Sequence, residues 1–150
     1  MIITEDLIRN FGFPNIDILR DANLNFRFEG GKDKNEDGVK FHVVNRDTEI
    51  FTMDFYIRRA NGSMAEVRNI SELKKRHIHL NYVTTSPEYR KNGITTFYIK
   101  KVIKLAKYNG IDLISLIVAP SGKKDNALNE EELKAFYEKF STNEVKFIAI

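Results

Sequence analysis

The chain has 150 residues, a net charge of +3, a hydrophobic fraction of 42% and no cysteine. This length predicts a single domain with a core of its own, and the missing cysteines exclude disulfides and thiolate catalysis and fit a cytoplasmic protein. There is no apolar run long enough to cross a membrane and no signal-peptide pattern, and the three histidines lack a zinc-type spacing, so we expect neither a membrane nor a metal partner.

The first third of the chain predicts one helix and one strand. Thr4 to Arg9 reads as a short helix, with the threonine as its N-cap and two acids in its first turn. Residues 16–22 fit either a helix or an extended chain. Asn23 to Phe28 alternates polar and apolar residues, which predicts a strand, and the charged, glycine-rich segment from Gly30 to Gly38 predicts a loop.

The middle of the chain predicts a hairpin. Val39 to Val44 and Glu49 to Arg58 are strand-like, and Asn45 to Thr48 supplies the turn between them. Asn61-Gly62 predicts a further turn, and Ile70 to Arg76 predicts a short polar connection with some helical character.

The second half predicts a strand and a helix in alternation. His77 to Thr85 is a β-branched and aromatic strand, whose period of two places His77, His79 and Asn81 on one face and Ile78, Leu80 and Tyr82 on the other. The elements expected after it are an amphipathic helix at Thr95 to Tyr108, a strand at Ile111 to Val118, an acidic helix that contains residues 135–140, and a final strand at Glu144 to Ile150. Antiparallel pairs followed by a βαβ unit predict an α+β fold, a mixed and mostly antiparallel sheet with helices on both faces.

The stretch from Ser86 to Thr96 carries the clearest functional signal. It runs from a strand into a helix, and it is basic with a glycine at its turn. Unpartnered N–H groups and the helix dipole make such a loop suited to an anion such as phosphate. Its single glycine satisfies neither the Walker pattern nor the dinucleotide-binding pattern. Taken alone, Asn92-Gly93 also fits an ordinary turn between a strand and a helix.

Two motifs resemble those of the GNAT superfamily of acyl-CoA-dependent N-acyltransferases. Arg90 to Thr95 resembles the pyrophosphate-binding pattern Gln/Arg-x-x-Gly-x-Gly/Ala, with Thr95 in place of the last small residue. Phe136 to Ser141 resembles the closing signature Phe/Leu-Tyr-x-Lys-x-Gly-Phe, with Ser141 in place of the glycine. The resemblance covers roughly residues 77–140, and a sheet that places a βαβ unit after antiparallel strands agrees with it.

The resemblance implies acetyl-CoA as the acyl donor. The backbone of the strand would hold the pantetheine arm at Val83, Thr84 and Thr85, and the loop would hold the pyrophosphate at Arg90, Lys91, Asn92, Gly93, Ile94, Thr95 and Thr96. Tyr137 would donate a proton to the departing sulfur, although Leu133, Phe136, Tyr137 and Phe140 also form an apolar helical stripe that would suit plain packing. Asn126 and Asn129 are candidates for a further bond to the pantetheine arm.

A transferase of this kind also needs a base for the acceptor amine. His79 is the first candidate and His77 the second, because an ordinary imidazole titrates near neutrality. Histidines occupy comparable places in some members of the superfamily that modify arylalkylamines. The competing interpretation is a partly buried histidine with a backbone hydrogen bond, or one in a charged surface cluster that follows Lys74-Lys75-Arg76.

Three functions remain open. The leading one is N-acetylation of a primary amine by direct attack on acetyl-CoA, with the acceptor unidentified. The second is a degenerate domain of the same fold that binds acyl-CoA or a partner without catalysis, which the departures at Thr95 and Ser141 keep open. The third is a nucleic-acid-binding domain, suggested by ten basic residues against two acids between Arg68 and Lys107. The third is disfavoured because that stretch contains no recognised reading motif, and four of the basic residues, Lys100, Lys101, Lys104 and Lys107, fit the solvated face of the helix.

Overall fold

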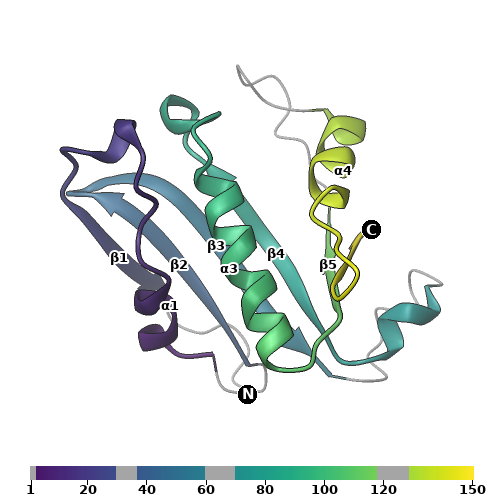
Figure 1. Cartoon of the computed structure of the whole chain (residues 1–150). Helices are drawn as coiled ribbons and strands as arrows, with labels where there is room; N and C mark the ends of the chain where they lie inside the picture. Colours follow the sequence, from purple (N-terminus) through teal and green to yellow (C-terminus); the bar gives the residue numbers. More distant parts are fainter. Residues whose placement is uncertain (1–2, 30–36, 60–69, 118–128) are drawn as a thin grey trace.

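A computed structural model describes residues 3–29, 37–59, 70–117 and 129–150. Its centre is a six-stranded mixed sheet in the order β1-β2-β3-β4-β5-β6, with the first four strands antiparallel to their neighbours and the last three parallel (Figure 1). The strands are β1 (Leu24–Glu29), β2 (Asp37–Asn45), β3 (Thr48–Arg58), β4 (His77–Thr85), β5 (Leu113–Leu116) and β6 (Lys146–Ala149). The α+β class and the mixed sheet predicted from the sequence are confirmed.

The helices are unevenly distributed over the two faces of the sheet. The α-helices are α1 (Glu5–Phe11), α3 (Ile94–Tyr108) and α4 (Glu130–Glu138), and the 3-10 helices are η1 (Asp17–Leu19), η2 (Ser71–Lys74) and η3 (Pro87–Tyr89). All three α-helices lie against the same face (Figure 1). The other face receives Leu73 of η2, which packs beside Leu113 of β5. Helical structure therefore reaches both faces, as predicted, but over β1 to β4 the face opposite the α-helices bears polar side chains.

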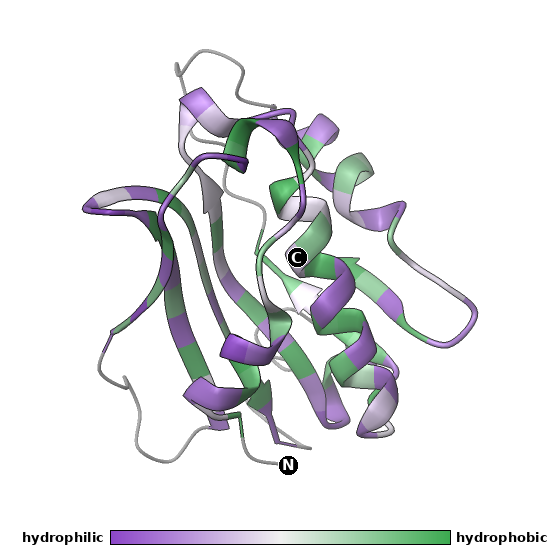
Figure 2. Ribbon diagram, turned by 60° about the vertical axis from the view of Figure 1, so that its left-hand side comes forward, coloured by the Kyte–Doolittle hydropathy of each residue, from purple (hydrophilic) through white to green (hydrophobic). Residues whose placement is uncertain are grey.

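The helix-facing side of the sheet holds the main core. Phe41 and Phe51 are fully buried, and both rings contact that of Tyr98 of α3, Phe51 stacking on it with centroids 4.8 Å apart. The Tyr98 hydroxyl donates a hydrogen bond of 2.9 Å to the backbone oxygen of Gly12, which ties α3 to the end of α1. Each large apolar side chain buried here stabilises the fold by about 1.5–3 kcal/mol. Figure 2 shows how green and purple alternate along the strands, as expected when each strand buries one side.

Several boundaries differ from those predicted. Asp37 and Gly38 belong to β2 rather than to a loop, and a Cβ on Gly38 would come within 2.4 Å of the Tyr56 Cβ, so the strands approach closely there because of the glycine. Residues 17–19 of the ambiguous segment form η1. The predicted strand from Ile111 is shorter, since β5 covers only Leu113–Leu116. The predicted turn at Asn61-Gly62 lies outside the described residues.

A β-bulge in β4 makes the predicted face of Tyr82 wrong. Asp54 of β3 pairs with Tyr82, whereas the next residue, Phe55, pairs with Leu80, so Asn81 is an extra residue between the two pairs. The period of two breaks at this point. Tyr82 therefore lies with the polar residues on the open face, and not with Ile78 and Leu80 in the core as the unbroken alternation predicted.

Candidate active site

The β4 and β5 strands pair over only three residues and then separate. Pairing runs from Ile78↔Ile114 to Leu80↔Leu116, and β4 continues to Thr85 without β5 beside it. The backbone groups of β4 that face β5 beyond Leu80 therefore have no strand partner on that side among the described residues. An extended ligand can take the place of the missing strand there by pairing with the backbone.

The loop after β4 leads directly to the start of α3. Gly93 is the N-cap residue and adopts the left-handed conformation, with φ at 84°. Because glycine has no side chain, the start of α3 has no side-chain capping hydrogen bond. Phe97 is the first residue whose N–H bonds back to the cap, at 3.0 Å from the Gly93 oxygen. The N–H groups of Ile94, Thr95 and Thr96 therefore precede the regular bonding of the helix, and they form a positive end of the helix dipole.

Side chains fix the shape of this loop. The Arg90 Nε donates to the Thr85 oxygen at 3.1 Å, and the Asn92 amide donates to the backbone oxygen of Arg90 at 2.8 Å. Lys91 is exposed and adopts a positive φ of 64°. The loop is thus folded back onto the end of β4, and Lys91, Asn92 and Gly93 form its exposed rim.

The two departures from the family motifs have structural explanations. The Thr95 hydroxyl lies 2.8 Å from the Thr85 hydroxyl, so its side chain points toward β4 and joins the first turn of α3 to that strand. The Ser141 hydroxyl accepts the N–H of Phe147 at 2.9 Å, which anchors the start of β6.

The two candidate histidines are both completely buried. The His79 Nδ1 lies 2.8 Å from the Ser115 hydroxyl of β5, and the His77 Nδ1 lies 2.8 Å from the Lys75 backbone oxygen. Burial, with a smaller contribution from Arg58, lowers the pKa of His79 to about 4. Burial also lowers the pKa of His77. Both rings are therefore neutral at pH 7, and an amine in solvent cannot touch either one in this structure.

Tyr137 is almost buried on α4, where its ring meets that of Phe136 edge-on at 5.2 Å. Burial raises its pKa to about 12, so the hydroxyl keeps its proton throughout the neutral range. Asn129 caps α4 by accepting the N–H of Glu132 at 2.9 Å, which occupies its side-chain oxygen. Asn126 lies outside the described residues.

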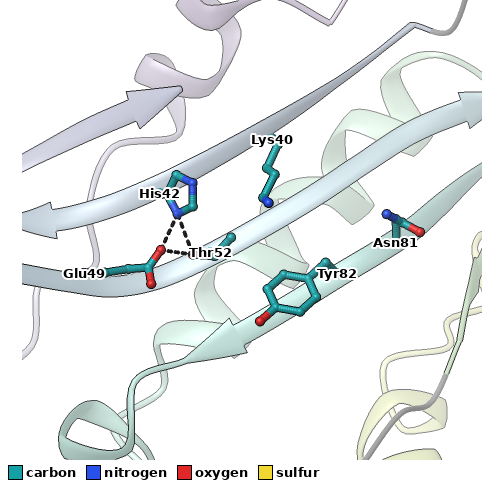
Figure 3. Close-up of a pocket in the computed structure, with 6 residues that line it drawn as sticks. All are labelled: Lys40, His42, Glu49, Thr52, Asn81 and Tyr82. Atoms are coloured by element: carbon teal, nitrogen blue, oxygen red, sulfur yellow. Dashed lines mark hydrogen bonds and ion pairs between the residues drawn. The ribbon is translucent and has the colours of Figure 1, made fainter. Parts of the chain in front are cut away.

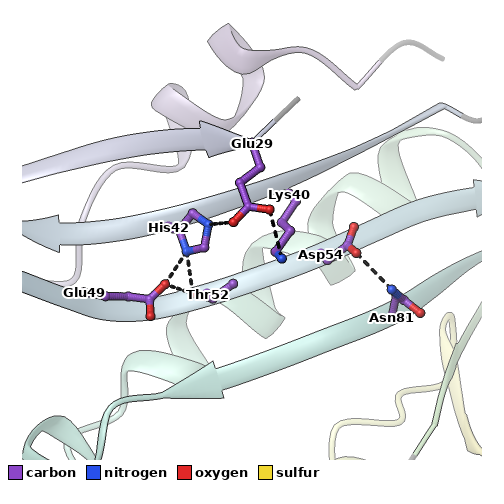
Figure 4. Close-up of polar contacts among 7 residues, drawn as sticks. All are labelled: Glu29, Lys40, His42, Glu49, Thr52, Asp54 and Asn81. Atoms are coloured by element: carbon purple, nitrogen blue, oxygen red, sulfur yellow. Dashed lines mark hydrogen bonds and ion pairs between the residues drawn. The ribbon is translucent and has the colours of Figure 1, made fainter. Parts of the chain in front are cut away.

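A polar cluster on the open face of the sheet was not singled out from the sequence. His42 of β2 bonds Glu29 of β1 through Nε2 at 2.8 Å, and it contacts both Glu49 and Thr52 through Nδ1 (Figure 4). A pocket of about 310 Å³ opens beside this cluster, lined by Lys40, His42, Glu49, Thr52, Asn81 and Tyr82 (Figure 3). The available signal was the alternation of polar residues along the predicted hairpin, from Lys40 to His42 and from Thr52 to Asp54.

Hydrogen bonds stabilise the ionised form of both glutamates in this cluster. A hydrogen bond from Lys40 holds the pKa of Glu29 below its ordinary value, with a smaller effect of His42, and the same contact raises the pKa of Lys40. A hydrogen bond from Thr52 lowers the pKa of Glu49. Both glutamates are therefore ionised and already hydrogen-bonded at neutral pH.

Several of the basic residues between Arg68 and Lys107 make local contacts. Lys75 pairs with Asp112 at 2.7 Å, and Lys107 with Glu144 at 3.5 Å. Lys101 lies over the Phe97 ring. Arg68 lies outside the described residues. No group of three or more potential metal ligands occurs in the parts of the chain that the structure describes, and none of the described helices is long and apolar enough to span a membrane.

β4 separates from its parallel neighbour β5 and leads into the start of α3, which is the arrangement that the resemblance to GNAT proteins predicts. The model of the acetyltransferase (GNAT) family matches residues 17–140, and the chain belongs to this family. No curated protein matches the chain.

Proposed function

We propose that this protein is an N-acetyltransferase that uses acetyl-CoA and acetylates a primary amine by direct attack. One observation carries the proposal. β4 no longer pairs with β5 after Leu80, and the loop that follows β4 leads to the start of α3, which has no side-chain cap. The pantetheine arm would pair with the backbone at Val83, Thr84 and Thr85, and the pyrophosphate would meet the N–H groups of the loop from Arg90 to Thr96.

The reaction requires no covalent enzyme intermediate. The amine nitrogen attacks the thioester carbonyl, the carbon–sulfur bond breaks, and the sulfur takes a proton. Tyr137 is the proposed donor of that proton, and its hydroxyl is protonated at neutral pH. His79 remains the first histidine candidate for the base, but its burial limits it to accepting a proton relayed by other groups.

The experiment is calorimetric titration with acetyl-CoA, followed by a panel of amines monitored for release of free thiol. We expect binding of acetyl-CoA at about 1:1, together with thiol release that depends on the amine. Failure to bind acetyl-CoA would reject the proposal.

A second function is favoured by the burial of both histidines. If no group can deprotonate the amine, the domain would bind acyl-CoA without transferring the acetyl group. Saturable binding with no thiol release across the whole panel would support this degenerate domain.

A further inference from the structure

The reacting end of acetyl-CoA would lie beside the bulge of β4. If the proposed function holds, the pyrophosphate lies at the start of α3, and the pantetheine arm runs back along β4 from Thr85 to Val83. The thioester then comes next to Asn81 and Tyr82, just beyond the last pair that β4 forms with β5 at Leu80. Both side chains are exposed, and both line the pocket of about 310 Å³ on the open face.

The amide of Asn81 has a fixed orientation in this pocket. Its Nδ2 donates a hydrogen bond of 2.9 Å to the Oδ2 of Asp54 on β3. A carboxylate accepts hydrogen bonds, so the nitrogen of the amide faces Asp54, and Figure 4 shows the oxygen on the side of the amide away from Asp54. Because β3 and β5 flank β4 on opposite edges, this oxygen is directed toward the edge that β5 leaves. Within the described part of the chain, the oxygen makes no hydrogen bond.

Asp54 takes part in more than this one contact. It is 6% exposed and lies opposite Lys40 of β2 in the register, where its charge also acts on the Lys40 ammonium. Asp54 therefore belongs to the charge network of the face, and it does not line the pocket. For the pocket, its effect is to hold the Asn81 amide in one orientation.

A second group that can accept a hydrogen bond lies at the other end of the pocket. The Oε1 of Glu49 accepts from Thr52 at 2.6 Å and contacts His42, whereas its Oε2 makes no hydrogen bond or ion pair among the described residues. The carboxylate is thus held through one oxygen, and the other is open to a bound molecule. Thr52 pairs with Thr84, two residues along β4 from Tyr82, so the carboxylate lies roughly 7 Å along the strands from the level of Tyr82.

The charges around the pocket nearly balance. Three carboxylates face three basic side chains across the strands, with Glu29, Glu49 and Asp54 against Arg27, Lys40 and His42. A second charge on the acceptor would meet groups of its own sign as well as of the opposite sign. Hydroxyl groups, by contrast, can hydrogen-bond to either kind and replace the water that the polar lining loses on binding.

We propose that this pocket binds the acceptor, that the Asn81 Oδ1 accepts a hydrogen bond from its reacting amine, and that the Glu49 Oε2 accepts one from a hydroxyl group at its other end. The acceptors belong to the small hydroxylated primary amines, such as amino sugars. The inference rests on the proposed function and names the substrate class and two binding residues of that site.

Asn81 orients the amine but takes no proton from it. The amine reacts in its neutral form, with one N–H donated to the Asn81 oxygen and its lone pair directed toward the acetyl carbon. The carbon–nitrogen bond forms and the carbon–sulfur bond breaks. The nitrogen loses one proton and the sulfur gains one, so the transfer balances without a further reactant.

The first test compares Asn81→Ala with the matched control Asn25→Ala, with glucosamine as the acceptor. Asn25 is an exposed asparagine of the edge strand β1 and does not line the pocket. We expect Asn81→Ala to lower kcat/KM about tenfold or more and Asn25→Ala to leave it unchanged, and both should keep the wild-type thermal shift with acetyl-CoA. Asp54→Asn no longer fixes the amide, so kcat/KM should fall there too. Because Asp54 acts through Asn81, adding Asp54→Asn to Asn81→Ala should cost little more.

The second test examines the other end of the pocket. Cyclohexylamine keeps a six-membered ring and an amine but lacks the hydroxyl groups of glucosamine, so we expect wild type to prefer glucosamine. Glu49→Ala should raise the KM for glucosamine about tenfold with little change for cyclohexylamine. The Glu49 side chain is 43% exposed, so folding should survive. The control is Glu144→Ala, which removes an exposed acid paired with Lys107 outside the pocket and should change neither KM.

Several results would overturn the inference alone. These are full turnover of glucosamine in Asn81→Ala, an equal loss for both amines in Glu49→Ala, and a preference for cyclohexylamine or putrescine over glucosamine. If wild type binds acetyl-CoA but turns over no amine, calorimetry with glucosamine and coenzyme A decides. Saturable binding that Asn81→Ala weakens would support the acceptor site, and no binding would overturn it. Absence of an acetyl-CoA shift in the wild-type protein would instead reject the proposed function on which the inference rests.

Discussion

The hydroxyl groups of Thr85 and Thr95 lie 2.8 Å apart and join the last residue of β4 to the first turn of α3. Thr85 is buried and Thr95 is partly buried, so the bond is shielded from water. It fixes the start of the helix relative to the strand along which we place the thioester. A contact between two side chains thus links the loop and the strand edge that we propose to hold the pyrophosphate and the pantetheine arm.

Thr95→Val should weaken both the fold and the binding of acetyl-CoA. Valine keeps the shape but leaves the buried Thr85 hydroxyl without this partner, so we expect a loss of about 1 kcal/mol in the free energy of unfolding. Urea denaturation measures this loss. Thr96→Val makes the same chemical change one residue later, where no side-chain hydrogen bond is present in the described structure, and should cost less. Equal losses would show that the Thr85 contact contributes nothing specific.

Gly93→Asp should abolish the thermal shift produced by acetyl-CoA. The substitution adds bulk and negative charge at the proposed pyrophosphate site, and the left-handed φ of 84° adds backbone strain. Gly110→Asp is the matched control, because Gly110 has a φ of 68°, also has open space around its Cβ position, and lies beyond the other end of α3. Both variants should melt lower than wild type, but only Gly110→Asp should keep the shift. A retained shift in Gly93→Asp would remove this loop from the binding site.

Tyr137→Phe should lower kcat by roughly two orders of magnitude and leave acetyl-CoA affinity nearly unchanged. Phenylalanine keeps the ring that packs against Phe136, so the melting temperature should stay close to that of the wild type. Steady-state kinetics and calorimetry separate the two effects. Full turnover in Tyr137→Phe together with unfolding of Tyr137→Ala would show that this residue only packs.

His79 should make the protein less stable in mild acid. Its pKa is about 4 in the folded protein and near 6.5 when unfolded, so between these values the unfolded chain binds the extra proton. Stability therefore rises with pH from 4 to 6.5 and loses this dependence above that range. Between pH 7.5 and pH 5, we expect wild type to lose about 2 kcal/mol more than His79→Gln. Parallel denaturation curves at the two pH values would contradict the buried, neutral imidazole.

The sequence by itself determined the second half of the fold and the family to which the chain belongs. The strand at His77 to Thr85, the basic loop and the helix after it were predicted within a residue or two, because local periodicity and turn chemistry dictate them. The motif around Gly93 pointed to the acetyltransferase family, and the family match over residues 17–140 confirms it. The turn into α3 places Gly93 at a positive φ, which restricts the residues of this short segment, so the signal lies in the local sequence.

Only the tertiary structure decided which groups meet on the open face. The bulge at Asn81 reverses the expected orientation of Tyr82, and it depends on how β4 pairs with β3 rather than on the β4 sequence. The contacts of His42 with Glu29 and Thr52 join three strands whose register no single segment encodes. Burial likewise lowers the pKa of His79 below that of an ordinary histidine. Residues distant in sequence acquire these properties through strand pairing and packing, which a local pattern of residues does not contain.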